Sequence, residues 1–330
     1  DGNLPPSDSV RVEEYVNYFN QNYSNPPRHQ AFGISMDGAP SPFTQTERYQ
    51  MLRVGIQGYA VPDEERKDAS LTFVIDVSGS MDMDNRLGLV KRSLELLVEQ
   101  LGRRDTVSIV VYGTEARVVL DPTPGSDKDA ILSAIYSLHP EGSTNAEAGI
   151  RLGYKMALRA YTPDGINRVI LCSDGVANVG NTEAEVILDE IRGHVEEGVT
   201  MTTIGFGMDN YNDTLMEQLA DNGDGFYAYV DDMRESKRLF IDNLTSTLQT
   251  IAMDAKVQVD FNPEVVMRYR LVGFENRAVA DDDFRDNSVD AGEIGAGHSV
   301  TALYEVKLYP EAYGKIATVF LRWEDPDTRA

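Results

Sequence analysis

The feature that most constrains the fold is an alternation of short apolar segments with amphipathic ones between residues 70 and 252. Residues 71–75 predict a buried strand, and the apolar residues at helical spacing between Leu87 and Leu101 predict the helix that follows it. Strands that alternate with helices build a mostly parallel sheet covered by helices on both faces. We therefore expect a doubly wound α/β domain over residues 70–252. Its other predicted strands are 107–112, 117–120, 168–172, 200–204 and 225–230, and its other predicted helices are 127–138 (capped by Ser126), 146–160, 183–197, 213–220 and 234–251.

The two ends of the chain have a different pattern. Residues 31–69 contain a strand-like segment in which Leu52, Val54 and Ile56 form one apolar face, and residues 253–330 contain strand-like segments without helices. Both sets of strands have edges that need cover, so we expect one β-sandwich-like domain built from both chain ends, with the α/β domain inserted in it. Residues 1–30 predict a short helix and an extended segment.

Composition excludes several classes of function. The chain has 330 residues with 30 Lys and Arg against 54 Asp and Glu, a formal charge of −24, which would repel a nucleic acid. No segment approaches the roughly 20 apolar residues that span a bilayer, so we expect no transmembrane segment. The single cysteine, Cys172, allows no internal disulfide and no zinc site rich in cysteine, and its apolar strand predicts a buried, inert thiol.

Oxygen-bearing side chains follow two predicted strands and precede a predicted helix. Ligands of open parallel sheets bind beyond the carboxyl ends of the strands, where these segments would lie. An isolated Asp-x-Ser-x-Ser is also typical of a capped turn, but three such loops in this order indicate a site for a hard divalent cation, above all Mg²⁺. The candidate ligands are Asp76, Ser78, Ser80, Thr144 and Asp174.

These three loops resemble the metal-ion-dependent adhesion site of von Willebrand factor type A domains. The resemblance implies that Ser78 and Ser80 coordinate through their hydroxyls, that Thr144 coordinates directly in the engaged state, and that Asp76 and Asp174 act directly or through water. It implies Mg²⁺, with Mn²⁺ or Ca²⁺ as alternatives, and a partner protein that supplies a carboxylate to the cation. In the family, engagement can move the last helix, here residues 234–251.

The flanking segments resemble the YfbK-like group of bacterial von Willebrand factor A proteins. Residues 9–19 precede the α/β domain, and residues 290–298 and 300–304 follow it, with the pattern of that group. The resemblance implies an extracytoplasmic location at the cell envelope or surface, with an export signal or lipid anchor expected before Asp1, although the residues leave a cytoplasmic location open. The identity of the partner and the oligomeric state stay open as well.

Two other functions fit part of the pattern. Phosphotransferases of the haloacid dehalogenase type also place an Asp after the first strand and use Mg²⁺, but they need a second Asp where this chain has Ser78, so we expect no enzyme. The alternative to an adhesion-type module is a non-catalytic subunit or scaffold that works with an AAA+ ATPase. That ATPase would be a separate protein, because this chain carries no phosphate-binding loop of its own.

Three further groups of polar residues lie near the expected site or in an acidic run. Asp209 and Tyr211 would lie on the rim that faces a ligand, although a helix cap at Asn212 or Asp213 explains the segment equally well. Residues 82–85 predict a solvated turn. The acidic residues between 281 and 293 predict a solvated loop, with a second cation site as the alternative.

Overall fold

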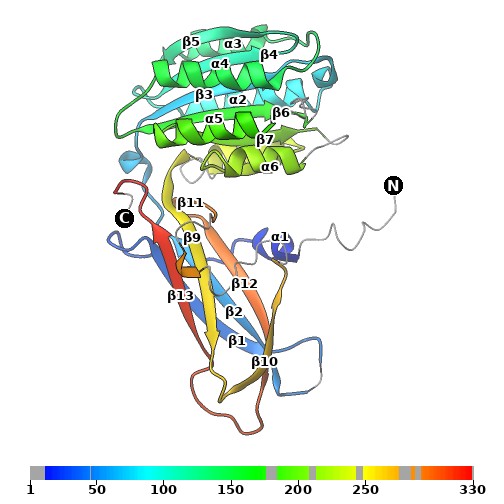
Figure 1. Cartoon of the computed structure of the whole chain (residues 1–330), viewed down its shortest axis with the longest axis vertical. Helices are drawn as coiled ribbons and strands as arrows, with labels where there is room; N and C mark the ends of the chain where they lie inside the picture. The colour runs from blue at the N-terminus through cyan, green and yellow to red at the C-terminus, as the bar shows by residue number, and fades with distance from the viewer. Residues whose placement is uncertain are drawn as a thin grey trace. The chain divides into compact units, whose positions relative to one another are not determined.

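The computed structural model describes residues 12–44, 46–175, 184–207, 213–242, 248–274, 284–286 and 291–328. The chain forms two compact units. One unit comprises Asp63–Gln249, and the other combines Asp1–Pro62 with Thr250–Ala330 (Figure 1). Both ends of the chain thus contribute to one unit, and the α/β unit is inserted between them, as the change of pattern along the sequence predicts.

The unit Asp63–Gln249 is built on a six-stranded sheet in the order β5-β4-β3-β6-β7-β8. All neighbouring strands are parallel except β4 and β5, which form an antiparallel pair. The first strand of this unit, β3, lies between β4 and β6, so the strand order reverses direction at β3. The strands are β3 (Ala69–Asp76), β4 (Thr106–Tyr112), β5 (Ala116–Pro124), β6 (Ile166–Ser173), β7 (Thr200–Phe206) and β8 (Tyr227–Val230).

Helices pack on both faces of this sheet. Alternate residues of β3 point to opposite faces, so Phe73 and Ile75 pack with α2 and α3, whereas Val74 packs with α4. Helices α4, α5 and α6 lie side by side over the second face (Figure 1). The helices are α2 (Leu87–Gln100), α3 (Lys128–Ser137), α4 (Ala146–Arg159), α5 (Ala184–Glu196), α6 (Asp213–Asp221) and α7 (Met233–Lys237), with short 3₁₀ helices at η2 (Asp63–Glu65) and η3 (Gly79–Met81).

Two glycines let α4 approach the sheet closely. A Cβ at Gly153 would overlap Cγ2 of Val74, and a Cβ at Gly149 would lie 2.6 Å from Cδ1 of Tyr112. Both contacts are tighter than side chains tolerate, so α4 packs its backbone directly against β3 and β4. The N-terminus of α4 is thereby fixed close to the carboxyl ends of these strands.

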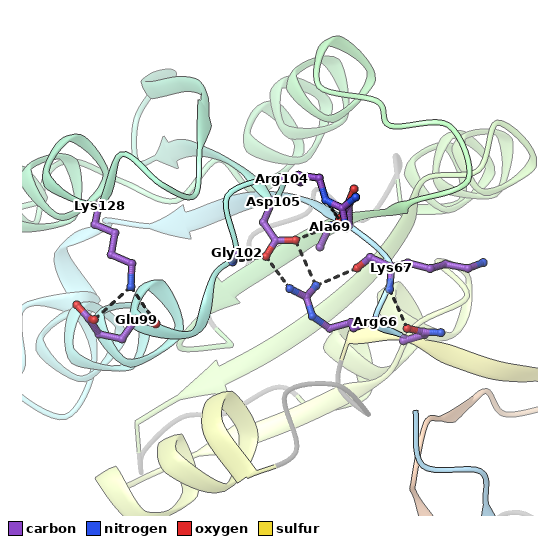
Figure 2. A network of polar contacts seen from close by, with 10 residues as sticks. Arg66, Lys67, Ala69, Glu99, Gly102, Arg104, Asp105 and Lys128 are labelled. Carbon is purple, nitrogen blue, oxygen red and sulfur yellow. Dashed lines mark hydrogen bonds and ion pairs between the residues drawn. The ribbon is translucent and has the colours of Figure 1, made fainter. Parts of the chain in front are cut away.

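The ends of β3 and β4 opposite to Asp76 are held by a buried carboxylate. Asp105 is 2% exposed and accepts hydrogen bonds from the backbone N–H of Ala69 at 2.8 Å and of Gly102 at 2.7 Å. Its Oδ2 pairs with Nη2 of Arg66 at 2.6 Å (Figure 2). A buried charge of this kind is stable when it is paired and hydrogen-bonded, as it is here.

The second unit is a two-layer β structure. Its sheets have the orders β1-β2-β12-β10 and β11-β9-β13, and the pairs within them are antiparallel. Leu52 and Val54 of β2 pack with Val306 of β12 on one layer and with Phe261 of β9 on the other, so the predicted apolar face of residues 50–57 forms the core. The strands are β1 (Phe32–Pro40), β2 (Tyr49–Gly58), β9 (Thr250–Phe261), β10 (Val266–Val272), β11 (Ile294–Gly295), β12 (Ser299–Leu308) and β13 (Ala317–Glu324).

The predicted N-terminal helix is present as α1 (Val12–Asn17) and is attached to β12. The side chain of Asn17 donates to the carbonyl of Thr301 at 3.1 Å and accepts from its N–H at 2.7 Å. The hydroxyls of Tyr23 and Thr301 lie 2.9 Å apart. These contacts satisfy backbone groups of β12 that face α1.

Two local predictions are wrong. The cap of α3 is Asp127, whose side chain accepts from the N–H of Ala130, and not Ser126. The predicted helix 234–251 is also too long, because α7 passes into a π-helical turn, η4 (Arg238–Asp242), and Thr250 already begins β9. Strand pairing of β9 with β13 and β11 outweighs the helical spacing of the apolar residues there.

Candidate metal centre

The end of β3 and the first loop after it (residues 77–82) together carry three of the five predicted ligands. Asp76 is the last residue of β3 and is fully buried. Its Oδ1 accepts the backbone N–H of Ser78 at 2.8 Å, so the turn after the strand closes on its own carboxylate. The hydroxyls of Ser78 and Ser80 lie 3.0 Å apart. Asp76, Ser78 and Ser80 therefore form one compact cluster of oxygen atoms.

The third loop (residues 174–175) follows β6 and joins this cluster. Ser173, the last residue of β6, donates from its hydroxyl to Oδ2 of Asp76 at 3.1 Å. Asp174 comes next and is 1% exposed. Because β3 and β6 are neighbouring parallel strands, their carboxyl ends meet at the same edge of the sheet, and Asp76 and Asp174 meet there.

The second loop (residues 139–145) is tied to the first by its backbone. The N–H of Gly79 donates to the carbonyl of Gly142 at 3.1 Å. The N–H of Glu141 donates to the carbonyl of Val77 at 2.5 Å. Asn145 caps α4 by accepting from the N–H of Ala148 at 3.1 Å.

Thr144 lies between anchored residues of this loop and is half-buried. The N–H of Ser143 donates to Oγ1 of Thr114 at 3.1 Å, and the N–H of Asn145 donates to the carbonyl of Gly113 at 2.9 Å. The Thr144 hydroxyl makes no hydrogen bond within the described part of the chain. The structure thus brings its loop to the cluster without joining its side chain to the other four residues.

Burial and negative charge dominate the electrostatics of the cluster. Burial raises the pKa of Asp76, the charge of Asp174 raises it further, and the hydrogen bonds from Ser78 act in the opposite direction. Tyr112 pairs with Asp76 in the sheet register and is fully buried. Burial, followed by the charge of Asp76, raises the pKa of this phenol well above its ordinary value. Such a site favours an added positive charge.

The donor set fits a hard divalent cation. Two carboxylates and three hydroxyls are oxygen ligands of the kind that Mg²⁺ and Ca²⁺ prefer. Among the described residues, no group of three or more His, Cys, Asp and Glu gathers closely enough to hold a metal ion, so a cation here would depend on hydroxyls as well. The buried phenol oxygen of Tyr112 has no hydrogen-bond partner within the described part of the chain, and it adds an unsatisfied polar atom beside Asp76.

One residue beside the predicted ligands, Arg86, is not predicted from the sequence. Arg86 is 5% exposed, and its Nη1 lies 2.9 Å from Oδ2 of Asp174 and 2.7 Å from the carbonyl oxygen of Ser80. It follows the exposed residues 82–84, which form the solvated turn that the sequence predicts. Its local sequence gives no signal for this role, because only the fold places residue 86 beside residue 174.

Other predicted features fall partly outside the described residues. The rim residues Asp209 and Tyr211 lie outside them, as does most of the acidic segment 281–293. Cys172 is fully buried on β6, and burial raises the pKa of its thiol. Two surface hollows lie elsewhere, one around Tyr313 in the β unit and one between Arg66 and Arg104 in the α/β unit.

The part of the chain that contains these loops matches a known family. The von Willebrand factor type A domain family matches residues 70–243, more than half of the chain. The chain belongs to the von Willebrand factor type A family. Residues 246–328 match the C-terminal family of YfbK, described as an uncharacterized protein, and residues 1–53 match a second von Willebrand factor family. The chain is thus a YfbK-like member of the von Willebrand factor type A family.

Individual relatives agree with this assignment. Uncharacterized protein YfbK of Escherichia coli is 40% identical over 314 residues, which cover 93% of this chain and 54% of that protein. Inter-alpha-trypsin inhibitor heavy chain H3 of human is 27% identical over 166 residues, which cover 48% of this chain and 18% of that protein. A von Willebrand factor type A structure from Catenulispora acidiphila superposes with a TM-score of 0.55 at 17% identity, covering 93% of this chain and 72% of that chain.

The chain spans about half the length of YfbK, the curated relative that it matches over most of its own length. Within the described residues, no helix combines the length and the apolar character that a membrane crossing requires. A von Willebrand factor type A domain generally acts as a protein-interaction module, and its family commonly binds a divalent metal and a protein ligand.

Proposed function

We propose that this chain is a non-catalytic, adhesion-type binding module in which Asp76, Ser78, Ser80, Thr144 and Asp174 hold a divalent cation. The convergence of three loops at the carboxyl ends of β3 and β6 carries the proposal. Ligands of open α/β sheets bind at this edge, at the point where the strand order reverses. Mg²⁺ is the proposed ion, with Mn²⁺ and Ca²⁺ as alternatives.

The neutral hydroxyls give the site its proposed chemistry. The three hydroxyls are neutral, and where Asp76 or Asp174 acts through water, the charge of a bound cation is not fully compensated by the groups bound to it directly. When bound, the cation supplies an open coordination position that attracts a carboxylate of a partner protein. Ser78 and Ser80 orient each other through their hydroxyls, and Asp76 is held by the N–H of Ser78, so the cluster is arranged before a ligand arrives.

The same residues support a binding function over a catalytic one. An acid/base pair for phosphoryl transfer needs a second carboxylate close to Asp76, two positions further along the first loop. This chain has the hydroxyl of Ser78 at that position, held against Ser80. We therefore propose that the module does not turn over a substrate.

The metal site is tested by thermal unfolding after chelation, repeated with added Mg²⁺, Mn²⁺ and Ca²⁺. A ligand that binds only the folded state raises the melting temperature by mass action. We expect a metal-dependent rise in the wild type and its loss in Asp174→Asn. The matched control is Asp105→Asn, which removes a buried charge at the opposite edge of the same sheet and should lower the melting temperature but keep the metal-dependent rise. Absence of a rise in the wild type, together with no heat in a direct titration, would refute the site.

The open position is tested with acetate as the carboxylate probe. Protein-bound Mn²⁺ should broaden the carboxyl carbon signal of acetate far more than the carbonyl signal of acetamide, a neutral molecule of the same size. Asp174→Asn should abolish the difference. Equal broadening of both molecules would mean that a bound cation offers no position to a carboxylate.

We also propose an extracytoplasmic location, which the YfbK-like resemblance supports. Fractionation of cells that make the native protein tests it: recovery with the envelope or outside the cell is expected. Recovery with the cytosol would instead favour the alternative of a scaffold that works with a separate ATPase.

A further inference from the structure

Arg86 connects two of the three loops of the candidate site. Its Nη1 donates to the backbone carbonyl of Ser80 in the first loop at 2.7 Å and to Oδ2 of Asp174 in the third loop at 2.9 Å. It immediately precedes α2, and 6% of its side chain is exposed. A single guanidinium thus connects Ser80 and Asp174, which lie more than ninety positions apart in the chain.

The stem of Arg86 is held by the end of β7. Gly207 follows β7 with φ +105°, and a Cβ there would lie 2.8 Å from both Cγ and Nε of Arg86. A side chain at position 207 would therefore displace the arginine. The backbone conformation at Gly207 and the close contact together show that Arg86 has a defined place beside the candidate ligands.

The charge of Arg86 changes what the site offers to a cation. Asp76 and Asp174 are both buried, and a buried carboxylate without a positive partner is strongly destabilising. Arg86 supplies that partner to Asp174 without a metal. The same positive charge repels any second cation within a few ångströms, and burial of these residues leaves the repulsion weakly screened.

We propose that Arg86 is a resident counter-cation of the candidate site: it holds Ser80 and Asp174 in place before a metal binds, and its charge lowers the affinity of the site for a divalent cation. This inference rests on the proposed metal-binding function and adds a positioning residue to it. The module would then keep its loops assembled without metal and would bind the ion reversibly.

The test compares Arg86→Met with the wild type in two measurements. Met fills the space of the arginine stem without charge or donors. In chelator, Arg86→Met should melt at a lower temperature, because Asp174 keeps its buried charge and loses the ion pair with Arg86. In calorimetric titration with Mn²⁺ and Mg²⁺, it should bind about tenfold or more tighter than the wild type, because the repulsion is gone. The rise in melting temperature on adding metal should therefore be larger in the variant.

Two further variants separate charge from packing. Arg86→Lys keeps the positive charge and should bind metal about as weakly as the wild type, and it serves where Arg86→Met does not fold. Arg66→Met breaks the buried pair with Asp105 in the same unit, far from the candidate ligands along β3 (Figure 2). It should lower the melting temperature but leave the metal affinity unchanged.

The outcomes distinguish this inference from the proposed function. If the wild type binds metal and Arg86→Met binds it equally or more weakly, Arg86 is not a counter-cation and the inference fails alone. Tight binding by Arg86→Lys, equal to that of Arg86→Met, would overturn it as well. If neither the wild type nor any Arg86 variant binds metal, the proposed function itself fails. Binding by Arg86→Met and not by the wild type would show that Arg86 opposes the cation, but it would still refute the proposed function, because the native chain would hold no metal.

Discussion

The hydroxyl of Ser173 donates to Oδ2 of Asp76 over 3.1 Å and so joins the last residues of two neighbouring strands. Ser173 also accepts the N–H of Gly175 at 3.2 Å. One small side chain therefore links the carboxylate after β3 to the backbone that follows Asp174. The geometry of the candidate site depends on this link before any ligand is bound.

Ser173→Ala should destabilise the protein by about 1–3 kcal/mol, because it removes a donor from a carboxylate that is fully buried. Ser137→Ala is the control: that hydroxyl is exposed and bonds only to the carbonyl of Ala134, so a change within about 0.5 kcal/mol is expected. Urea unfolding monitored by circular dichroism measures both. Equal midpoints for Ser173→Ala and the wild type would contradict the role assigned to Ser173.

Gly153→Ala should destabilise the α/β unit by about 1–3 kcal/mol, because the new methyl group would overlap Val74 and force α4 away from β3. The same substitution at Gly193 in α5 meets nothing within 4 Å. It should stabilise the protein by about 0.5–1 kcal/mol through helix propensity alone. Opposite signs of the two changes in thermal unfolding are the expected result, and a stabilising Gly153→Ala would mean that α4 is not in tight contact with the sheet.

Cys172 should resist alkylation in the folded protein. Its thiol is fully buried, and burial raises its pKa, so at pH 8 the reactive thiolate is both scarce and inaccessible. Because the chain has one cysteine, iodoacetamide labelling followed by mass spectrometry reports on this residue alone. We expect complete labelling in urea and almost none in native buffer. Rapid labelling of the native protein would show that the β6 region opens readily.

The β unit should lose stability in acid, because the stabilising contribution of ionised Glu305 is lost there. The hydrogen bond from Ser41, together with Arg270, lowers the pKa of this carboxyl in the folded state. A lowered pKa means that the ionised group stabilises the folded state at pH values above the pKa of the unfolded chain. That contribution is lost as the pH falls through the lowered value. The difference in urea midpoint between the wild type and Glu305→Gln should therefore be present at pH 7 and shrink in acid. A difference that grows in acid would have the wrong sign.

The sequence predicts the strands and helices whose apolar residues are continuous or regularly spaced. The eight residues of β3 are all buried, and the apolar stripe of α2 packs against them, so both are visible as uninterrupted or regularly spaced apolar residues. The three loops also lie where the sequence predicts them, because ligand loops of parallel sheets lie at the carboxyl ends of the strands. Their ligation of a metal stays a prediction.

The errors arise where distant contacts outweigh local pattern. Thr250 and Ile251 continue the helical spacing of the residues before them, yet they begin β9 because Ala252 pairs with Ile294 and Met253 with Glu324. Arg86 resembles any exposed residue after an acidic turn, and its burial follows from its ion pair with Asp174 in the loop after β6. The partners Ile294, Glu324 and Asp174 all lie too far along the chain to be detected by local periodicity.

The pairing of β2 with β12 has a consequence for synthesis of the chain. Val54 of β2 pairs with Ala302, so its neighbour in the sheet leaves the ribosome long after residues 63–249 are complete. The α/β unit can therefore fold first. Until β12 is made, β1 and β2 form a hairpin whose apolar face is exposed. Such a hairpin is prone to associate with other chains until its partner strands arrive. Yield of folded protein should thus depend on how quickly the last third of the chain follows, and loss of that part would leave an aggregating fragment with an intact α/β unit.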